Sequence, residues 1–93
     1  MRLRWSRRSR DHLEEIRRYI AEDDVGAAER VRLQIVETVK MLRSLPRLGH
    51  TGRKEGTREL SVARLPFVIV YRIDINDEDE LVILGIYHGA RDR

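Results

Sequence analysis

The sequence contains no cysteine, which excludes a disulfide framework, a thiolate zinc site and a cysteine nucleophile. Histidine is also scarce. The three histidines stand apart from one another, and none has acidic or histidine neighbours at the spacing that metal ligands need. We therefore expect no metal and no cofactor.

Long apolar runs are missing as well. The longest, residues 65–71 and 81–87, are far shorter than the roughly 20 apolar residues that a helix needs to cross a bilayer. The first ten residues, MRLRWSRRSR, carry five arginines and no apolar stretch like that of a signal peptide. We expect a cytoplasmic protein that does not enter a membrane.

What is present is a short and strongly ionised chain. Its 93 residues are 41% hydrophobic and 38% charged, a balance typical of a globular protein rather than a disordered one. A chain of this length rarely forms two cores, so residues 1–93 are expected to make a single domain.

The charges are distributed unevenly along the chain. Residues 1–18 and 40–72 are basic, with net charges of +4 and +6, whereas residues 19–39 and 73–93 carry −3 and −4. A basic face suits an acidic partner, either a nucleic acid or an acidic protein segment. A mixed, solvated surface is the alternative, because the net charge of the whole chain is only +3.

The first two elements are predicted from periodicity. Residues 1–5 alternate between charged and apolar side chains, which indicates a short strand. A helix is expected over residues 10–22, capped by Ser6 or Ser9. Its apolar stripe consists of Leu13, Ile16 and Ile20.

A second helix follows almost at once. Asp23 or Asp24 is a suitable N-cap, and Pro46 prevents the helix from continuing. The short connection between the two helices predicts an antiparallel hairpin. The apolar stripe of the second helix consists of Ala28, Val31, Ile35, Val39 and Leu42.

The second half of the chain is predicted to be a loop followed by three strands. Residues 46–57 hold one proline and three glycines, and strands are expected at 58–64, 67–75 and 81–88, the last two separated by the turn 76–79. The last strand is almost wholly apolar and should be central. The predicted fold class is α+β, in the order β-α-α-β-β-β. An antiparallel sheet carries the helical hairpin on one face, and the first strand pairs along the sheet.

Several motifs in this order resemble the ParE/RelE superfamily of toxins from bacterial type II toxin–antitoxin systems. The resemblance spans nearly the whole chain and lies in the order and spacing of the motifs together. The motifs are the loop Pro46-x-x-Gly49-x-x-Gly52, the run Gly56-Thr-Arg-Glu-Leu60, the strand Phe67-Val-Ile-Val-Tyr-Arg72 and the ending Ile86-Tyr-His-Gly-Ala-Arg91.

Within the superfamily, the pattern is closer to ParE-like toxins than to RelE-like ones. RelE-like members cleave mRNA on the ribosome and use lysine and arginine on the sheet to stabilise phosphate charge. Here Val68 stands where their arginine would be, and Glu59 and Ser61 stand where their lysines would be. Only Arg91 matches one of their basic positions. The enzymatic cations are therefore largely replaced.

The resemblance implies a toxin that binds and inhibits a cellular target, with DNA gyrase as the expected target, and a role in plasmid stabilisation. It also implies a cognate antitoxin, ParD-like or similar, whose acidic tail neutralises the toxin in a hetero-oligomer. Two alternatives stay open. One is a RelE-like, ribosome-dependent mRNA endoribonuclease, and the other is a non-toxic degenerate member that only binds a partner.

Candidate site residues follow from these readings. In an endoribonuclease, His88 would be the general acid or base beside phosphate-binding arginines. The catalytic set would then be Arg58, Tyr87, His88 and Arg91. In a binding toxin, the target-contacting candidates are Arg58, Arg64, Tyr87, His88 and Arg91. Each has a structural alternative, namely capping of the sheet, an internal pair for Arg58, or a solvated position.

The antitoxin is expected to cover apolar surface that the isolated chain leaves open, in a groove between the hairpin and the sheet. A basic chain would attract an acidic tail. The antitoxin-binding candidates are Leu13, Ile16, Ile20, Arg17 and Arg72.

Overall fold

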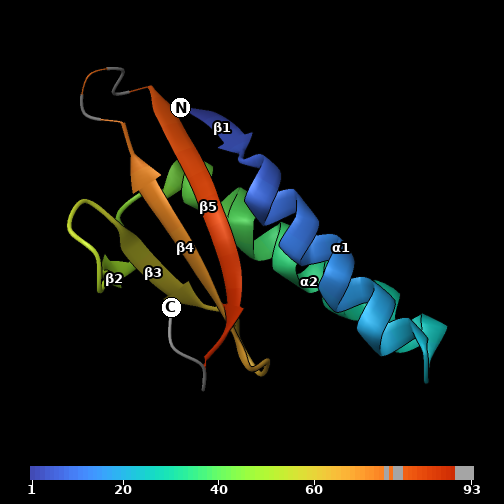
Figure 1. Cartoon of the computed structure of the whole chain (residues 1–93). Coiled ribbons are helices and arrows are strands. Elements are labelled where there is room, and N and C mark those ends of the chain that lie inside the picture. Colours follow the sequence, from blue (N-terminus) through green and yellow to red (C-terminus); the bar gives the residue numbers. More distant parts are fainter. Residues whose placement is uncertain (75, 77–78, 90–93) are drawn as a thin grey trace.

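A short strand and two helices precede four further strands in the computed structural model, which describes residues 1–74, 76 and 79–89 (Figure 1). The strands form one sheet, and both helices lie on the same side of it. The elements are β1 (Arg2–Trp5), α1 (Arg7–Ala21), α2 (Val25–Ser44), β2 (His50–Thr51), β3 (Arg58–Ser61), β4 (Phe67–Ile73) and β5 (Glu80–His88).

The two helices begin where side-chain caps are available. The Ser6 side chain accepts a hydrogen bond from the Ser9 backbone N–H at 3.1 Å, so α1 starts three residues earlier than expected. The Asp24 carboxylate accepts from the Ala27 N–H at 3.0 Å and caps α2 in the same way. Of the alternative caps, Ser6 and Asp24 are therefore the ones used.

The sheet has the order β1-β5-β4-β3-β2. The predicted α+β class and element order are confirmed, and β5 is central between β1 and β4. Two details differ from the prediction. The sheet is mixed, because β1 runs parallel to β5. It also gains β2, a two-residue strand whose short polar sequence gives no apolar alternation to detect.

The core lies between the hairpin and the sheet. Alternate residues of β4 and β5 face the helices, and those in the middle of β4 are almost completely buried there. Burial of this apolar area is the main term that stabilises the fold. The central residues are Ile35, Val39 and Leu42 of α2 with Ile69, Tyr71, Leu81 and Ile83 of the sheet. The other side of the sheet, which carries no helix, is called the helix-free face below.

The predicted strand 58–64 is shorter in the structure. It ends at Ser61, after which the Val62 N–H donates to the Phe67 carbonyl at 2.9 Å and closes a turn. Arg64 lies in this turn with φ of 65°, in the left-handed region. The predicted strand 67–75 is β4, and Ile75 lies outside the described residues.

The edge of β5 is completed by α1 where β1 ends. The Ser6 N–H donates to the Ile83 carbonyl at 3.0 Å, and the Ile86 N–H donates to Nδ1 of His12 at 3.1 Å. A helix side chain thus occupies the place of a neighbouring strand, so the edge of the central strand is not left open. Among the described residues, no helix is long and apolar enough to cross a membrane.

Candidate functional site

The helix-free face contains a cavity of about 320 Å³, called the open-face cavity below. Its lining comes from three parts of the chain: the start of α1, the segment from the end of β2 to β3, and the middle of β4 and β5. The lining residues are Ser6, Arg8, Arg53, Lys54, Thr57, Glu59, Val70, Leu84 and Tyr87. The cavity therefore combines an apolar floor with a basic rim.

The loop that carries Arg53 and Lys54 is held by short local bonds. The Gly52 N–H donates to the Thr57 carbonyl at 2.8 Å, and the Thr57 hydroxyl donates to the Lys54 carbonyl at 2.6 Å. Gly56 adopts φ of 81°, a conformation that other residues rarely take. The backbone that positions the two cations is consequently fixed.

Glu59 is the buried acidic group of the cavity, with only 3% of its surface exposed. It pairs with Val70 across β3 and β4, and its Oε2 accepts from the Arg53 backbone N–H at 3.1 Å. Carboxylates at such depth need hydrogen-bond partners, because desolvating an unpaired charge costs several kcal/mol or more. Glu59 thereby ties the basic loop to the sheet.

Tyr87 forms part of the floor. Its ring lies over Gly85, where a Cβ atom would come within 2.5 Å of Cε2 of Tyr87. The same ring meets the edge of the His12 ring at a centroid distance of 5.0 Å. Glycine at this position lets the tyrosine lie along the strand.

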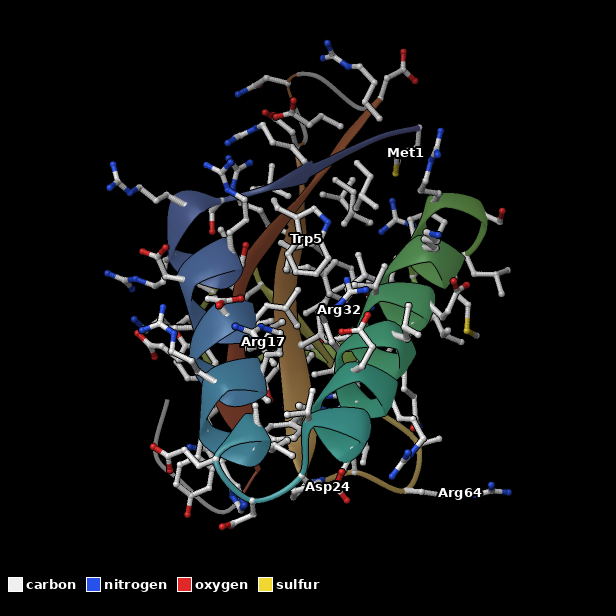
Figure 2. All side chains as sticks on the ribbon, turned by 90° about the vertical axis from the view of Figure 1, so that its right-hand side faces the viewer. Met1, Trp5, Arg17, Asp24, Arg32 and Arg64 are labelled. Atoms are coloured by element: carbon white, nitrogen blue, oxygen red, sulfur yellow. The ribbon has the colours of Figure 1, made fainter. Side chains whose placement is uncertain are left out.

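A second depression, the β1–α2 groove, lies on the helical side of the sheet. Its apolar wall is made by Leu3, Trp5 and Val36, and Lys40 and Arg43 stand beside it. Figure 2 shows Trp5 in the space between the two helices, which do not cover it on the side turned to the viewer. The groove is therefore an apolar surface flanked by cations.

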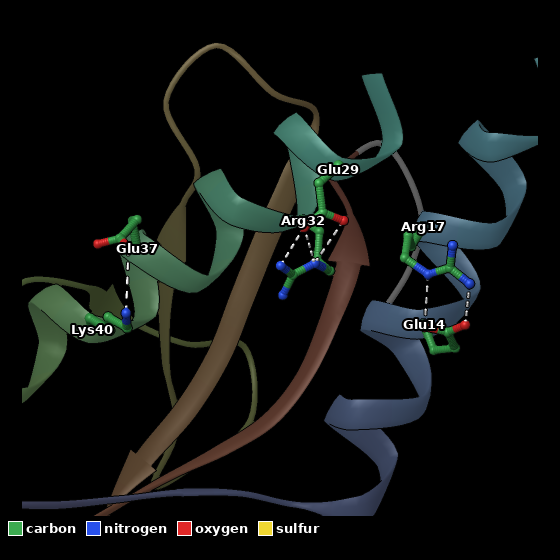
Figure 3. Close-up of polar contacts among 6 residues, drawn as sticks. All are labelled: Glu14, Arg17, Glu29, Arg32, Glu37 and Lys40. Carbon is green, nitrogen blue, oxygen red and sulfur yellow. Dashed lines mark hydrogen bonds and ion pairs between the residues drawn. The ribbon is translucent and has the colours of Figure 1, made fainter. Parts of the chain in front are cut away.

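Both helices carry ion pairs between residues three positions apart, as Figure 3 shows. Arg17 pairs with Glu14 at 2.5 Å on α1, and Arg32 pairs with Glu29 at 2.5 Å on α2. The hydrogen bond from Arg17 lowers the pKa of Glu14, and the hydrogen bond from Arg32 lowers the pKa of Glu29. Arg17 and Arg32 lie on facing sides of the two helices (Figure 2).

Tyr71 is a fully buried residue of β4 that carries a polar hydroxyl group. Its hydroxyl donates to the Pro46 carbonyl at 2.8 Å and accepts from the Gly49 N–H at 2.9 Å. Burial raises the pKa of this phenol, while the Gly49 hydrogen bond and the nearby charge of Arg58 oppose the rise.

Three of the proposed ribonuclease residues, Arg58, Tyr87 and His88, lie among the described residues, and they do not form one cluster. Arg58 pairs with Tyr71 in the sheet register and so shares the helical side, where its Nη1 donates to the Gly49 carbonyl at 2.6 Å. Tyr87 lies on the helix-free face, among the residues of the open-face cavity. His88 is exposed at the end of β5 with its ring 6.0 Å from that of Phe67.

The other two target-contacting candidates lie elsewhere. Arg64 is exposed in the turn between β3 and β4, remote in the sheet from the cavity loop. Arg91 lies outside the described residues. Arg58 donates to a backbone carbonyl, and it makes no ion pair with an acid within the described residues.

The antitoxin-binding candidates divide between the two sides of the sheet. Leu13 and Ile16 pack partly buried against the core, Ile20 is half-buried, and Arg17 lies beside them on α1. Arg72 pairs with Val82 on the helix-free face and makes an ion pair with Asp74 at 3.7 Å. Arg72 therefore does not share a surface with the other four.

Sequence reasoning missed most of the open-face cavity. Arg8, Arg53, Lys54 and Leu84 line the cavity, and none of them is among the candidate site residues predicted from the sequence. One signal was available, because the basic segments 1–18 and 40–72 contain all three of these cations. Within the described residues, no group of three or more His, Cys, Asp or Glu side chains is placed to hold a metal ion.

The fold and the two surfaces define a small α+β protein of the ParE/RelE toxin type, and comparisons with known proteins agree. The family model described as ParE toxin of type II toxin-antitoxin system, parDE, matches residues 3–93. A curated relative from Sinorhizobium fredii (strain NBRC 101917 / NGR234), named "Putative toxin Y4kP", is 41% identical over 88 residues, covering 95% of this chain and 88% of the relative.

Solved structures show the same architecture. A chain from the chromosomal ParDE toxin–antitoxin system of P. aeruginosa superposes with a TM-score of 0.84 at 28% identity, covering 95% of each chain. A chain from the RelBE2 toxin–antitoxin complex of Mycobacterium tuberculosis has a TM-score of 0.63 at 24% identity, covering 92% of this chain and 94% of that one, and shares the fold. The chain belongs to the ParE toxin family of type II toxin–antitoxin systems.

Proposed function

We propose that this ParE-family toxin acts by binding a cellular target, with DNA gyrase as that target, and is neutralised by a cognate antitoxin. The observation that supports binding over RNA cleavage is the buried carboxylate of Glu59 on the helix-free face. Together with Val68, it occupies positions where a RelE-like enzyme would need cations. A carboxylate there would repel a phosphodiester in the transition state.

The antitoxin is proposed to be a ParD-like protein whose acidic C-terminal tail occupies the β1–α2 groove. An apolar wall flanked by cations suits an amphipathic, acidic segment that folds as it binds. Arg43 has no ion-pair partner among residues 1–74, 76 and 79–89, so its charge is available to such a tail. The P. aeruginosa relative comes from a ParDE system, which supports the same pairing.

Expression of the chain alone tests the toxin function. We expect growth arrest with accumulation of gyrase–DNA cleavage products and an induced DNA-damage response. Primer-extension mapping of cellular mRNA in the same cultures is the counter-test. New cleavage sites at fixed codon positions, without gyrase cleavage products, would replace the binding mechanism with the ribonuclease.

Coexpression with the antitoxin tests the groove. Val36→Asp with Arg43→Glu should abolish copurification of the two proteins, because it places acidic groups in the apolar wall and removes a cation. Arg30→Glu lies on α2 but does not line the groove, so this control should leave copurification unchanged. Equal copurification of the groove variant and the wild type would refute this location.

A further inference from the structure

The rim of the open-face cavity carries cations from α1 and from the loop before β3. Arg8 and Lys54 have no ion-pair partner within the described part of the chain. Arg8 also stands in the first turn of α1, which contains no acidic residue. Cations at this end of a helix are disfavoured by the helix dipole, so an incoming carboxylate would relieve that repulsion.

The floor of the cavity calls for a different chemistry. Val70, Leu84 and Tyr87 are each only half-buried there and present apolar and aromatic surface to the opening. An apolar side chain placed on them would bury surface that is now wet, which favours binding. A volume of about 320 Å³ is at the lower end of the range for ligand pockets, enough for one large side chain with adjoining backbone.

The buried wall distinguishes between two kinds of anionic ligand. Glu59 places a carboxylate beside the floor, and it already accepts from the Arg53 N–H. Every nucleotide of a nucleic-acid strand carries a phosphate charge, and such a strand would bring these charges close to that carboxylate. A peptide can instead place an uncharged side chain at the centre and keep its acidic groups near Arg8 and Lys54 at the rim.

We propose that the open-face cavity is the site at which the toxin engages its protein target, by binding an acidic segment that carries one large apolar side chain. This inference rests on the proposed binding function. The β1–α2 groove involves the helical side of the sheet, whereas the cavity lies on the opposite face. A short target-like peptide should therefore still enter the cavity when the antitoxin tail occupies the groove.

The test compares two double charge reversals in the full-length chain. Arg8→Glu with Lys54→Glu alters the rim, and Arg30→Glu with Arg47→Glu makes the same change of net charge at exposed positions that do not line the cavity. We expect the rim variant to lose growth arrest while keeping its thermal transition and its antitoxin binding. The control variant should arrest growth like the wild type.

A direct binding measurement accompanies the growth assay. Fluorescence anisotropy would use a labelled peptide, Asp-Glu-Phe-Glu-Asp, against the free chain and the toxin–antitoxin complex. We expect the rim variant to bind at least tenfold more weakly than the wild type. A peptide with serine in place of phenylalanine should also bind more weakly, because it makes no contact with the floor.

The outcomes separate the inference from the function on which it rests. Growth arrest by the rim variant, equal to that of the wild type, overturns the inference and leaves the binding function standing. If the wild type itself does not arrest growth, the proposed function fails. The peptide titration alone then tests whether the cavity binds an acidic segment. Rim-dependent binding of hexathymidylate that exceeds binding of the peptide overturns the inference in favour of a nucleic acid.

Discussion

The hydroxyl of Tyr71 joins the centre of the sheet to the backbone N–H of Gly49 at 2.9 Å. The same hydroxyl donates to the Pro46 carbonyl, and Arg58 donates to the Gly49 carbonyl. A fully buried β4 residue therefore fixes the path of the segment that leaves α2 and enters β2. That segment leads into the loop carrying the cations of the open-face cavity.

Tyr71→Phe should destabilise the protein by about 1–3 kcal/mol, because it leaves the Gly49 N–H and the Pro46 carbonyl without their buried partner. Urea unfolding followed by circular dichroism measures this loss. Tyr19→Phe is the matched control, since Tyr19 is 76% exposed and should change nothing. Equal midpoints for all three proteins would show that the hydroxyl does not stabilise the fold.

Alkaline pH should weaken the fold through the same residue. The pKa of Tyr71 is raised above its ordinary value of 10.0 in the folded state, chiefly by burial. Its contribution is therefore complete below about pH 10 and is lost as pH rises through the folded-state pKa. The free energy of unfolding, measured from pH 8 upward, should fall more steeply in the wild type than in Tyr71→Phe. Parallel profiles would contradict this assignment.

Acidic pH should remove the stabilisation from the hairpin ion pairs. The folded-state pKa values of Glu14 and Glu29 lie below their ordinary value of 4.5, so their contribution is present above that pH and lost as pH falls through the folded values. Glu14→Gln with Glu29→Gln should lower the melting temperature at pH 7, with the difference from wild type shrinking in acid.

High salt should reduce the same difference in melting temperature, because both pairs are partly exposed to solvent and are therefore screened. Glu15→Gln with Glu55→Gln removes the same charge from two exposed carboxylates. This control should melt at the wild-type temperature at pH 7 and in acid. A control as unstable as the ion-pair variant would attribute the effect to net charge rather than to pairing.

His12→Ala should expose the edge of β5 that the His12 side chain covers. Nδ1 of His12 accepts from the Ile86 N–H, so alanine leaves that donor without its partner and should cost about 1–3 kcal/mol. Amide hydrogen exchange should accelerate at Ile86. His12→Asn can place a side-chain oxygen near the position of Nδ1 and should restore part of the protection. Unchanged exchange in the alanine variant would mean that the edge is closed by other means.

Much of the fold could be predicted because it depends on local patterns. The cap at Ser6, the two apolar stripes and the apolar β5 each act through neighbours in the sequence or through simple periodicity. Alternation along β4 also places Arg72 on the other face of the sheet from Tyr71. The separation of Arg72 from the candidates on α1 could therefore have been predicted from the strand itself.

The open-face cavity could not be predicted in the same way. Arg8 and Lys54 lie far apart in the sequence. Both line the cavity only because α1 packs along β5 while the loop before β3 lies over the same sheet. Tyr71 resembles any buried aromatic residue in its strand, and its partners are backbone atoms of a loop, which carry no side-chain signature. β2 is formed by two polar residues that pair only once β3 is in place.

The parallel pairing of β1 with β5 has a consequence for synthesis on the ribosome. The strand β5 is synthesised after every other described element. The pairing of β5 with β1 and with β4 therefore cannot begin until translation has passed residue 80. Contacts that span almost the whole chain form slowly, because closing so long a loop costs conformational entropy. Shorter nascent chains therefore lack the shared strand that both neighbours require. Attachment of β1 to the sheet is in this way coupled to synthesis of β5, and a translation product interrupted before residue 80 would lack the strand that joins β1 to β4.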